Sequence, residues 1–326
     1  MRNVVLVTTG GTIASRRNAA GDDVTVAASG GELLGLLPPL PADVAVEVDD
    51  FARIGSYNLD LEHAFLLIRR VATHLERSDV AGVVIAHGTD TMEETAFLAD
   101  LLVASDKPCV FTGAQRDADA TDGDGPRNLA QAVQLAASGL TGLGSVIVFE
   151  QEFHAARDAT KTHAYRTGTF TSMEHGKLGE IDGVRIILHR RPVLRTTIRA
   201  ERIEPAVDLV KLAMGSDGRF VRCAIATGAR GLVIEAFGRG NVTRAVLEAI
   251  TEAIAAGIVV VISSRCPQGR TQPIYGGDGG GRDVLRAGAL FAGDLSAVKT
   301  RVALAALLGG GASREEIAAT LERIGG

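Results

Sequence analysis

The chain has 326 residues, of which 46% are hydrophobic and 22% are charged, and its formal net charge is −5. This length exceeds that of most single domains, and the apolar fraction suffices for a sizeable core. The negative net charge leaves no excess of basic side chains that could bind nucleic acid. No apolar run approaches the ~20 residues that a membrane span needs. We therefore expect neither nucleic acid nor membrane as a partner.

Three cysteines, Cys109, Cys223 and Cys266, lie far apart and fit neither a metal spacing nor a disulfide framework. The residues before the first turn are too few for a signal peptide. We expect a protein of the reducing cytoplasm that needs no metal and no cofactor.

Short apolar strands alternate with longer helices in the first half of the chain. Strands are predicted at 3–8, 44–49, 82–86, 108–112 and 145–150, and helices at 31–37, 60–76, 91–104 and 125–138. Continuous apolar strands separated by helices are typical of a parallel sheet covered on both faces. From 151 to 180 the alternation stops, and charged, threonine-rich segments suggest hairpins.

The α/β alternation returns after a segment with two prolines, which indicates a connector. Strands are predicted near 221–225, 231–235 and 258–262, and helices at 242–255, 295–308 and 313–324. We predict a larger N-terminal α/β domain over 1–190 with a doubly wound, mostly parallel sheet. A linker over 191–212 and a smaller parallel α/β domain over 213–326 follow.

In open parallel sheets, ligand-binding residues follow the carboxyl ends of the strands. The first predicted strand runs into Thr8-Thr9-Gly10-Gly11-Thr12, which lacks the glycine spacing of nucleotide-binding loops. Two adjacent glycines let the backbone approach a ligand closely, although a plain turn explains them equally well. Thr12 becomes a useful nucleophile only if a nearby base takes its proton.

The third predicted strand runs into His87-Gly88-Thr89-Asp90-Thr91. Thr91 with Glu94, or Asp90 with Glu93, could form a helix capping box. A cap explains one of these residues but does not require all of them. Asp90 could instead bind an ammonium group, with a threonine beside it that activates a water, and the pattern leaves both interpretations open.

Three other segments offer polar groups. Ser56 could hold a carboxylate or cap the helix that starts near residue 60. The turn at Thr112-Gly113-Ala114 could present backbone amides to an oxyanion or be a simple glycine turn. Lys161 could be solvated surface or, if paired with Asp90, a cation that shifts a proton off Thr89. His87 and His163 are expected to be structural.

Two motifs, TTGGTIAS (8–15) and AHGTDTMEETA (86–96), resemble the threonine signatures of the bacterial L-asparaginase and glutaminase-asparaginase family. Shorter matches follow in family order at 54–56, 112–114, 124–126, 157–162, 238–241 and 263–265. The resemblance implies hydrolysis of the side-chain amide of L-asparagine through a threonine acyl-enzyme. It also implies a homotetramer, a dimer of intimate dimers, without a cofactor.

The resemblance assigns roles to individual residues. Thr12 would attack the amide, while Thr89, Asp90 and Lys161 would form a second triad that polarises a water or relays a proton. The implied substrate-binding residues are Gly11, Ser56, Tyr57, Thr89, Asp90, Ala114 and Asn241. Asn241 would reach the site from the C-terminal domain of a neighbouring chain.

The sequence departs from the family pattern at three places. Val24 stands where the family has a lid tyrosine, Tyr57 where it often has glutamine, and Asp278 is only a loose match to an acidic residue across the interface. The alternatives are a weaker asparaginase, an amidohydrolase for another amide or D-asparagine, or an amino-acid-binding relative without hydrolysis. The bulk of Tyr57 predicts that glutamine is disfavoured relative to asparagine. A tRNA-dependent amidotransferase subunit of this fold is disfavoured, because no basic surplus is present.

Overall fold

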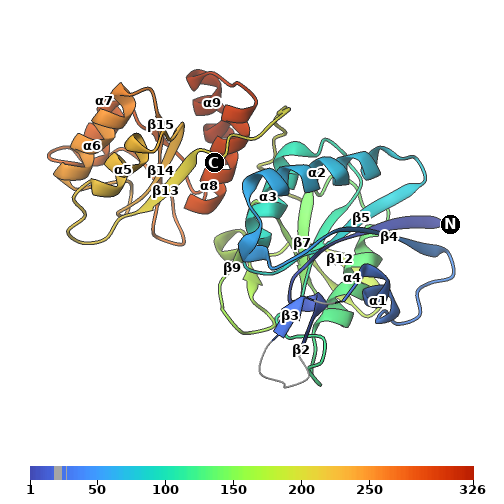
Figure 1. Cartoon of the computed structure of the whole chain (residues 1–326). Helices are drawn as coiled ribbons and strands as arrows, with labels where there is room; N and C mark the ends of the chain where they lie inside the picture. The colour runs from blue at the N-terminus through green and yellow to red at the C-terminus, as the bar shows by residue number, and fades with distance from the viewer. Residues whose placement is uncertain (18–23, 27) are drawn as a thin grey trace. The chain divides into compact units, whose positions relative to one another are not determined.

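The computed structural model describes residues 1–17, 24–26 and 28–326. These residues form two compact units, Met1–Val193 and Leu194–Gly326. Each unit has a sheet with parallel strands and helices packed on it (Figure 1). The predicted α/β class of both domains is confirmed.

The first unit contains an eight-stranded sheet in the order β12-β11-β8-β7-β6-β5-β1-β4. Its strands are β1 (Arg2–Gly10), β4 (Val44–Ile54), β5 (Val80–Ala86), β6 (Cys109–Thr112), β7 (Ser145–Phe149), β8 (Glu152–Ala155), β11 (Gly179–Asp182) and β12 (Arg185–Leu188). The neighbours from β4 to β7 are parallel, and those from β7 to β12 are antiparallel. The sheet is therefore mostly parallel where the predicted strands lie.

Two small antiparallel sheets complete the first unit. β2 (Ser15–Arg17) pairs with β3 (Val24–Val26), and β9 (Thr160–Lys161) pairs with β10 (Phe170–Thr171). The hairpins suggested for 151–180 are thus present. The lid assigned from the resemblance runs over 22–26, and its residues 22 and 23 lie outside the described residues.

Helices cover both faces of the large sheet. They are α1 (Gly30–Gly35), α2 (Leu61–Glu76), α3 (Met92–Leu102) and α4 (Gly125–Ala136), with short 3-10 turns η1 (Thr12–Ala14), η2 (Ser56–Asn58) and η3 (Met173–His175). α2 packs on β5 and α3 on β7, whereas α4 packs on β5, β6 and β7 from the other side. Local signals start two helices, because Ser29 forms a capping box with Glu32 and Asp60 accepts from the backbone of His63.

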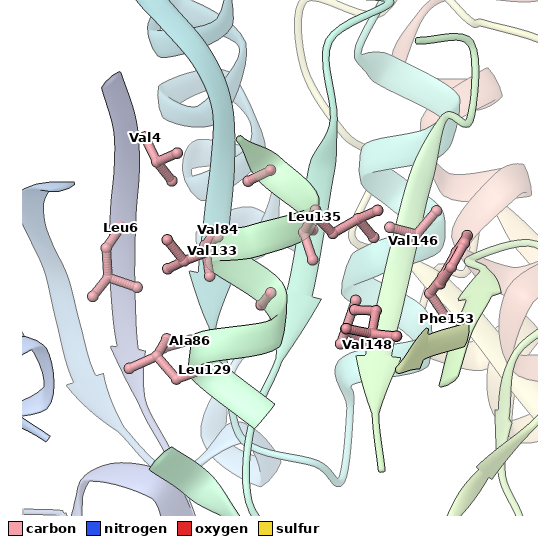
Figure 2. Packing of buried hydrophobic residues seen from close by; sticks show 14 of the residues in the cluster. Val4, Leu6, Val84, Ala86, Leu129, Val133, Leu135, Val146, Val148 and Phe153 are labelled. Carbon is pink, nitrogen blue, oxygen red and sulfur yellow. The ribbon is translucent and has the colours of Figure 1, made fainter. Parts of the chain in front are cut away.

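Apolar side chains of α4 seal one face of the sheet (Figure 2). Leu129 and Val133 on α4 face Leu6 on β1 and Val84 on β5. Each of these four side chains is at most 1% exposed. Burial of such side chains stabilises a fold by about 2 kcal/mol each, so this layer holds the strand ends in fixed register.

The second unit has a four-stranded parallel sheet in the order β13-β14-β15-β16. Its strands are β13 (Val207–Lys211), β14 (Gly231–Ala236), β15 (Val259–Ser264) and β16 (Leu290–Phe291). Its helices are α5 (Arg219–Ala226), α6 (Arg244–Ala255), α7 (Gly281–Ala287), α8 (Ala297–Gly309) and α9 (Arg314–Ile324).

Two predictions for the second half of the chain are wrong. The strand predicted at 221–225 lies within helix α5, where Val221 and Ala224 are buried one turn apart. A short apolar run does not distinguish a strand from a buried helix. The linker predicted over 191–212 contains strand β13, which is at the edge of its sheet and partly exposed, so its apolar pattern is weak.

Candidate active site

The parallel strands of the first unit end at one edge of the sheet. Thr8 of β1 is paired with Ala86 of β5, which is paired with Thr112 of β6. On the other side of β1, Gly10 is paired with Ile54 of β4. The four segments with candidate site residues therefore leave the sheet side by side, as expected for a parallel α/β sheet.

Glycine backbones bring three of these segments into direct contact. Gly11 has φ 82° and ψ −176°, and a Cβ on it would lie 2.4 Å from Cα of Gly88. A Cβ on Gly88 would lie 2.6 Å from Oγ of Ser56. Only residues without a side chain permit this approach. Thr12 and Thr89 each follow one of the two glycines, so they flank the same backbone contact.

Thr12 lies in the short turn η1 and is partly buried. The next residue, Ile13, is 2% exposed and anchors the turn. A Cβ on Gly125 would lie 3.0 Å from Cγ1 of Ile13 and 3.3 Å from Cβ of Ala114. The start of α4 therefore holds the first threonine signature against the turn after β6. Within the described residues, the Thr12 hydroxyl makes no hydrogen bond.

The second signature meets β9, which is 71 residues further along the chain. Nζ of Lys161 donates to Oγ1 of Thr89 over 2.8 Å and to Oδ1 of Asp90 over 2.7 Å. The lysine side chain is 15% exposed and that of Asp90 is 55% exposed. Of the two interpretations of Lys161, the structure thus places it in a network rather than on a solvated loop.

Hydrogen bonds of Ser56 join the turn after β4 to the second signature. Oγ of Ser56 accepts from the backbone N of Asp90 over 3.2 Å, and its carbonyl accepts from Oγ1 of Thr91 over 2.9 Å. The carboxylate of Asp60, rather than Ser56, caps α2. Thr91 makes no side-chain capping bond to α3, so both capping explanations for Ser56 and Thr91 are wrong.

Glu93 positions the lysine strand. Its carboxylate accepts from Oγ1 of Thr160 over 3.1 Å and from the backbone N of Lys161 over 3.2 Å. The sequence suggested Glu93 only as the partner of Asp90 in a capping box, whereas Asp90 pairs with the lysine instead. Only the placement of β9 beside α3 reveals this function.

The turn after β6 contributes a side chain that sequence reasoning missed. Oε1 of Gln115 accepts from Oγ1 of Thr89 over 3.0 Å. The backbone N of Gln115 donates to Asp124 over 3.0 Å, and Nδ2 of Asn128 donates to the same carboxylate over 3.2 Å. Asp124 therefore fixes the turn that contains Ala114. A polar residue directly after a predicted strand end was the available signal.

His87 is fully buried directly before the second signature. Its Nδ1 lies 2.7 Å from the carbonyl of Gly88, whereas its Nε2 has no hydrogen-bond partner. Burial lowers the pKa of His87 to about 4, opposed by the bond to Gly88. The imidazole is therefore neutral near pH 7 and donates from Nδ1, which agrees with a structural function.

Tyr57 and Asn241 lie in different units. The Tyr57 side chain is 74% exposed, and its ring folds back over Gly55, where a Cβ would lie 2.6 Å from the ring. In the second unit, Oδ1 of Asn241 accepts from the backbone N of Gly281 over 3.0 Å, and the exposed Asp278 has φ 46°. The structure thus brings Gly11, Ser56, Thr89, Asp90 and Lys161 together within one unit.

Among the residues that the structure describes, no group of three or more His, Cys, Asp or Glu side chains could hold a metal ion. In that same part of the chain, no helix combines the length and the apolar character that crossing a membrane requires. The groups that follow the strand ends include hydroxyls, the Asp90 carboxylate, the Lys161 ammonium group and backbone amides. These groups suit nucleophilic attack on an amide.

Comparison with known proteins places this site in a family. Residues 3–194 match the family model "Asparaginase, N-terminal", and residues 206–321 match "Glutaminase/Asparaginase C-terminal domain". The chain is 34% identical over 308 residues to an L-asparaginase of Bacillus licheniformis, covering 94% of this chain and 95% of that protein. It is 35% identical over 322 residues to a probable L-asparaginase of Deinococcus radiodurans, covering 96% and 95%.

L-asparaginase 2 of Escherichia coli is 33% identical over 278 residues, which cover 82% of this chain and 79% of that protein. The fold, the hydroxyl–lysine–carboxylate network and these matches define an amidohydrolase enzyme. The chain belongs to the asparaginase family, as the two threonine motifs predicted.

Proposed function

We propose that this enzyme hydrolyses the side-chain amide of L-asparagine to L-aspartate and ammonia through an acyl-enzyme on Thr12. One observation carries the proposal: Nζ of Lys161 contacts both the hydroxyl of Thr89 and the carboxylate of Asp90. The two family matches and the L-asparaginases of similar sequence support the choice of substrate.

In the first half of the reaction, Oγ1 of Thr12 attacks the amide carbon. The carbonyl oxygen becomes an oxyanion, for which the backbone amides at Thr89 and Ala114 are the proposed donors; one such donor contributes about 3 kcal/mol. When the C–N bond breaks, the leaving nitrogen takes up the proton from the Thr12 hydroxyl, and ammonia departs. An ester between Thr12 and the substrate acyl group remains.

In the second half, a water attacks the ester. Its hydroxide part joins the acyl carbon to give the new carboxyl group, and its second proton returns to Oγ1 of Thr12. We assign the polarisation of this water and the proton relay to Thr89, Asp90 and Lys161. The ammonium group of Lys161 donates to the Thr89 oxygen and orients that hydroxyl toward the water, while Asp90 holds the ammonium group in place.

We assign the α-groups of the substrate to Ser56 and Asp90. Oγ of Ser56 accepts from Asp90 N, so its own proton can be donated to the α-carboxylate. The half-exposed carboxylate of Asp90 can pair with the α-ammonium group. Gly11 and Tyr57 would line this end of the site, and Asn241 of a neighbouring chain would complete it in a homotetramer. A cytoplasmic location stays a prediction.

Ammonia release from L-asparagine tests the proposal. Wild-type protein and Thr73→Ala, which alters an exposed threonine of α2, should be active, whereas Thr12→Ala should lose activity. A Thr12→Ala variant that retains full activity would refute the acyl-enzyme. If wild type releases no ammonia but L-aspartate still raises its melting temperature, the amino-acid-binding alternative is correct instead.

A further inference from the structure

The side-chain amide of Gln115 bridges the Thr89 hydroxyl and the segment that follows Lys161. Oε1 of Gln115 accepts from Oγ1 of Thr89 over 3.0 Å. At its other end, Nε2 donates to the carbonyl oxygens of His163 over 3.4 Å and Arg166 over 3.3 Å. The amide therefore has one acceptor contact on one side and two donor contacts on the other.

These partners allow a single orientation of the amide. Carbonyl oxygens can only accept hydrogen bonds, so the NH₂ group of Gln115 must face His163 and Arg166. In the flipped orientation, the amide oxygen would face two carbonyl oxygens, and both favourable contacts would be lost. The oxygen of Gln115 must consequently face Thr89.

The turn that supplies the two carbonyls is itself held in place. Nδ1 of His163 accepts from the backbone N of both Tyr165 and Arg166, each over 3.0 Å. Oγ1 of Thr169 donates to the carbonyl of His163. Nη1 of Arg116, next to Gln115, donates to the hydroxyl of Tyr165 over 3.1 Å. These hydrogen bonds hold the turn over 163–169 in place, and this turn determines the orientation of the Gln115 amide.

A threonine hydroxyl has one proton and two lone pairs. The proton of Thr89 is directed to Gln115, and one lone pair accepts from Lys161 over 2.8 Å. The only hydrogen-bonding capacity that remains is the second lone pair. If the amide were flipped, Thr89 would accept from both Gln115 and Lys161 and would point its proton outwards.

We propose that Gln115 is a positioning residue that directs the Thr89 proton away from the reacting groups. Thr89 then serves as a hydrogen-bond acceptor for the O–H group of the attacking water or of Thr12. This inference rests on the proposed amide hydrolysis, and it assigns to Gln115 a role in rate rather than in substrate affinity.

Kinetics of Gln115→Met test the proposal, since methionine is similar in size but its sulfur is only a weak acceptor for Thr89. We expect kcat for L-asparagine to fall about 10- to 100-fold, a part of what general acid–base catalysis contributes, with KM changed less than about threefold. The urea midpoint should stay near that of wild type. The matched control Gln134→Met, on α4, should retain wild-type kinetics.

Gln115→Glu gives a readout that a merely structural role would not produce. The ionised carboxylate of this variant still accepts from Thr89 but has no donor for the turn carbonyls. At pH 8 its kcat should therefore stay at least about threefold above that of Gln115→Met, whereas a residue that only held the turn in place would lose activity equally in both variants.

The outcomes separate the two hypotheses. An active wild type with an unimpaired Gln115→Met, or with a Gln115→Glu as slow as Gln115→Met, would overturn the inference alone. A wild type that releases no ammonia would overturn the proposed function and this inference with it.

Discussion

Gly11→Ala tests whether contact between the two signature segments organises the site. The added Cβ would lie 2.4 Å from Cα and 2.5 Å from N of Gly88, where an ordinary contact begins at 3.4 Å. The segments would have to separate by the difference, 3.4 − 2.4 = 1.0 Å. A misplacement of about 1 Å in an active site can lower the rate about 100-fold.

The same substitution has a cost in stability. Alanine at φ 82° and ψ −176° occupies a backbone region that is nearly exclusive to glycine, which costs about 1–3 kcal/mol. Overpacking against the backbone of Gly88 costs about 1–3 kcal/mol more. We therefore expect the free energy of unfolding to fall by about 2–6 kcal/mol and kcat/KM for L-asparagine to fall about 100-fold.

Urea denaturation and ammonia release measure the two effects. Gly35→Ala is the matched control, because Gly35 lies in α1 with no neighbouring atom within 4 Å of its added Cβ. That variant should retain wild-type activity and gain up to about 1 kcal/mol of stability. If Gly11→Ala has the stability and the kcat/KM of wild type, the backbone contact does not organise the site.

Other perturbations address single groups. Lys161→Met should lower kcat at least about 100-fold, whereas Lys211→Met, in the second unit, should leave kcat unchanged; ammonia release compares them. Because burial holds the pKa of His87 near 4 rather than 6.5, the unfolded chain binds a proton that the folded chain lacks between these pH values. The free energy of unfolding should thus fall as pH falls through that window, by about 3 kcal/mol more in wild type than in His87→Gln. Urea denaturation at several pH values measures this, and an equal pH dependence of the two proteins would contradict it. Tyr57→Gln should raise the rate on glutamine relative to asparagine, and an unchanged ratio would show that Tyr57 does not set the preference.

Local patterns explain why much of the first unit could be predicted. The buried strands β1, β5 and β7 are continuous apolar runs, and Asp60 starts α2 through its own carboxylate. Thr12 and Thr89 follow closely after two of these apolar runs, so the sequence alone indicated that both lie near strand ends. In the second unit, where α5 is a short apolar run and β13 a half-exposed edge strand, the local signal was ambiguous and the predictions were wrong.

The sequence alone determined the alternation of strands and helices, the family and the identities of Thr12, Thr89, Asp90 and Lys161 as candidates. Only the tertiary structure decided that Lys161 bonds to residues 71 and 72 positions away, that Glu93 holds its strand and that Gln115 accepts from Thr89. Hydrophobic periodicity involves residues that are close together in the chain, so it can be recognised in a short stretch of sequence. Hydrogen bonds between remote side chains depend on strand register and on the glycine contacts between turns, which no local pattern encodes.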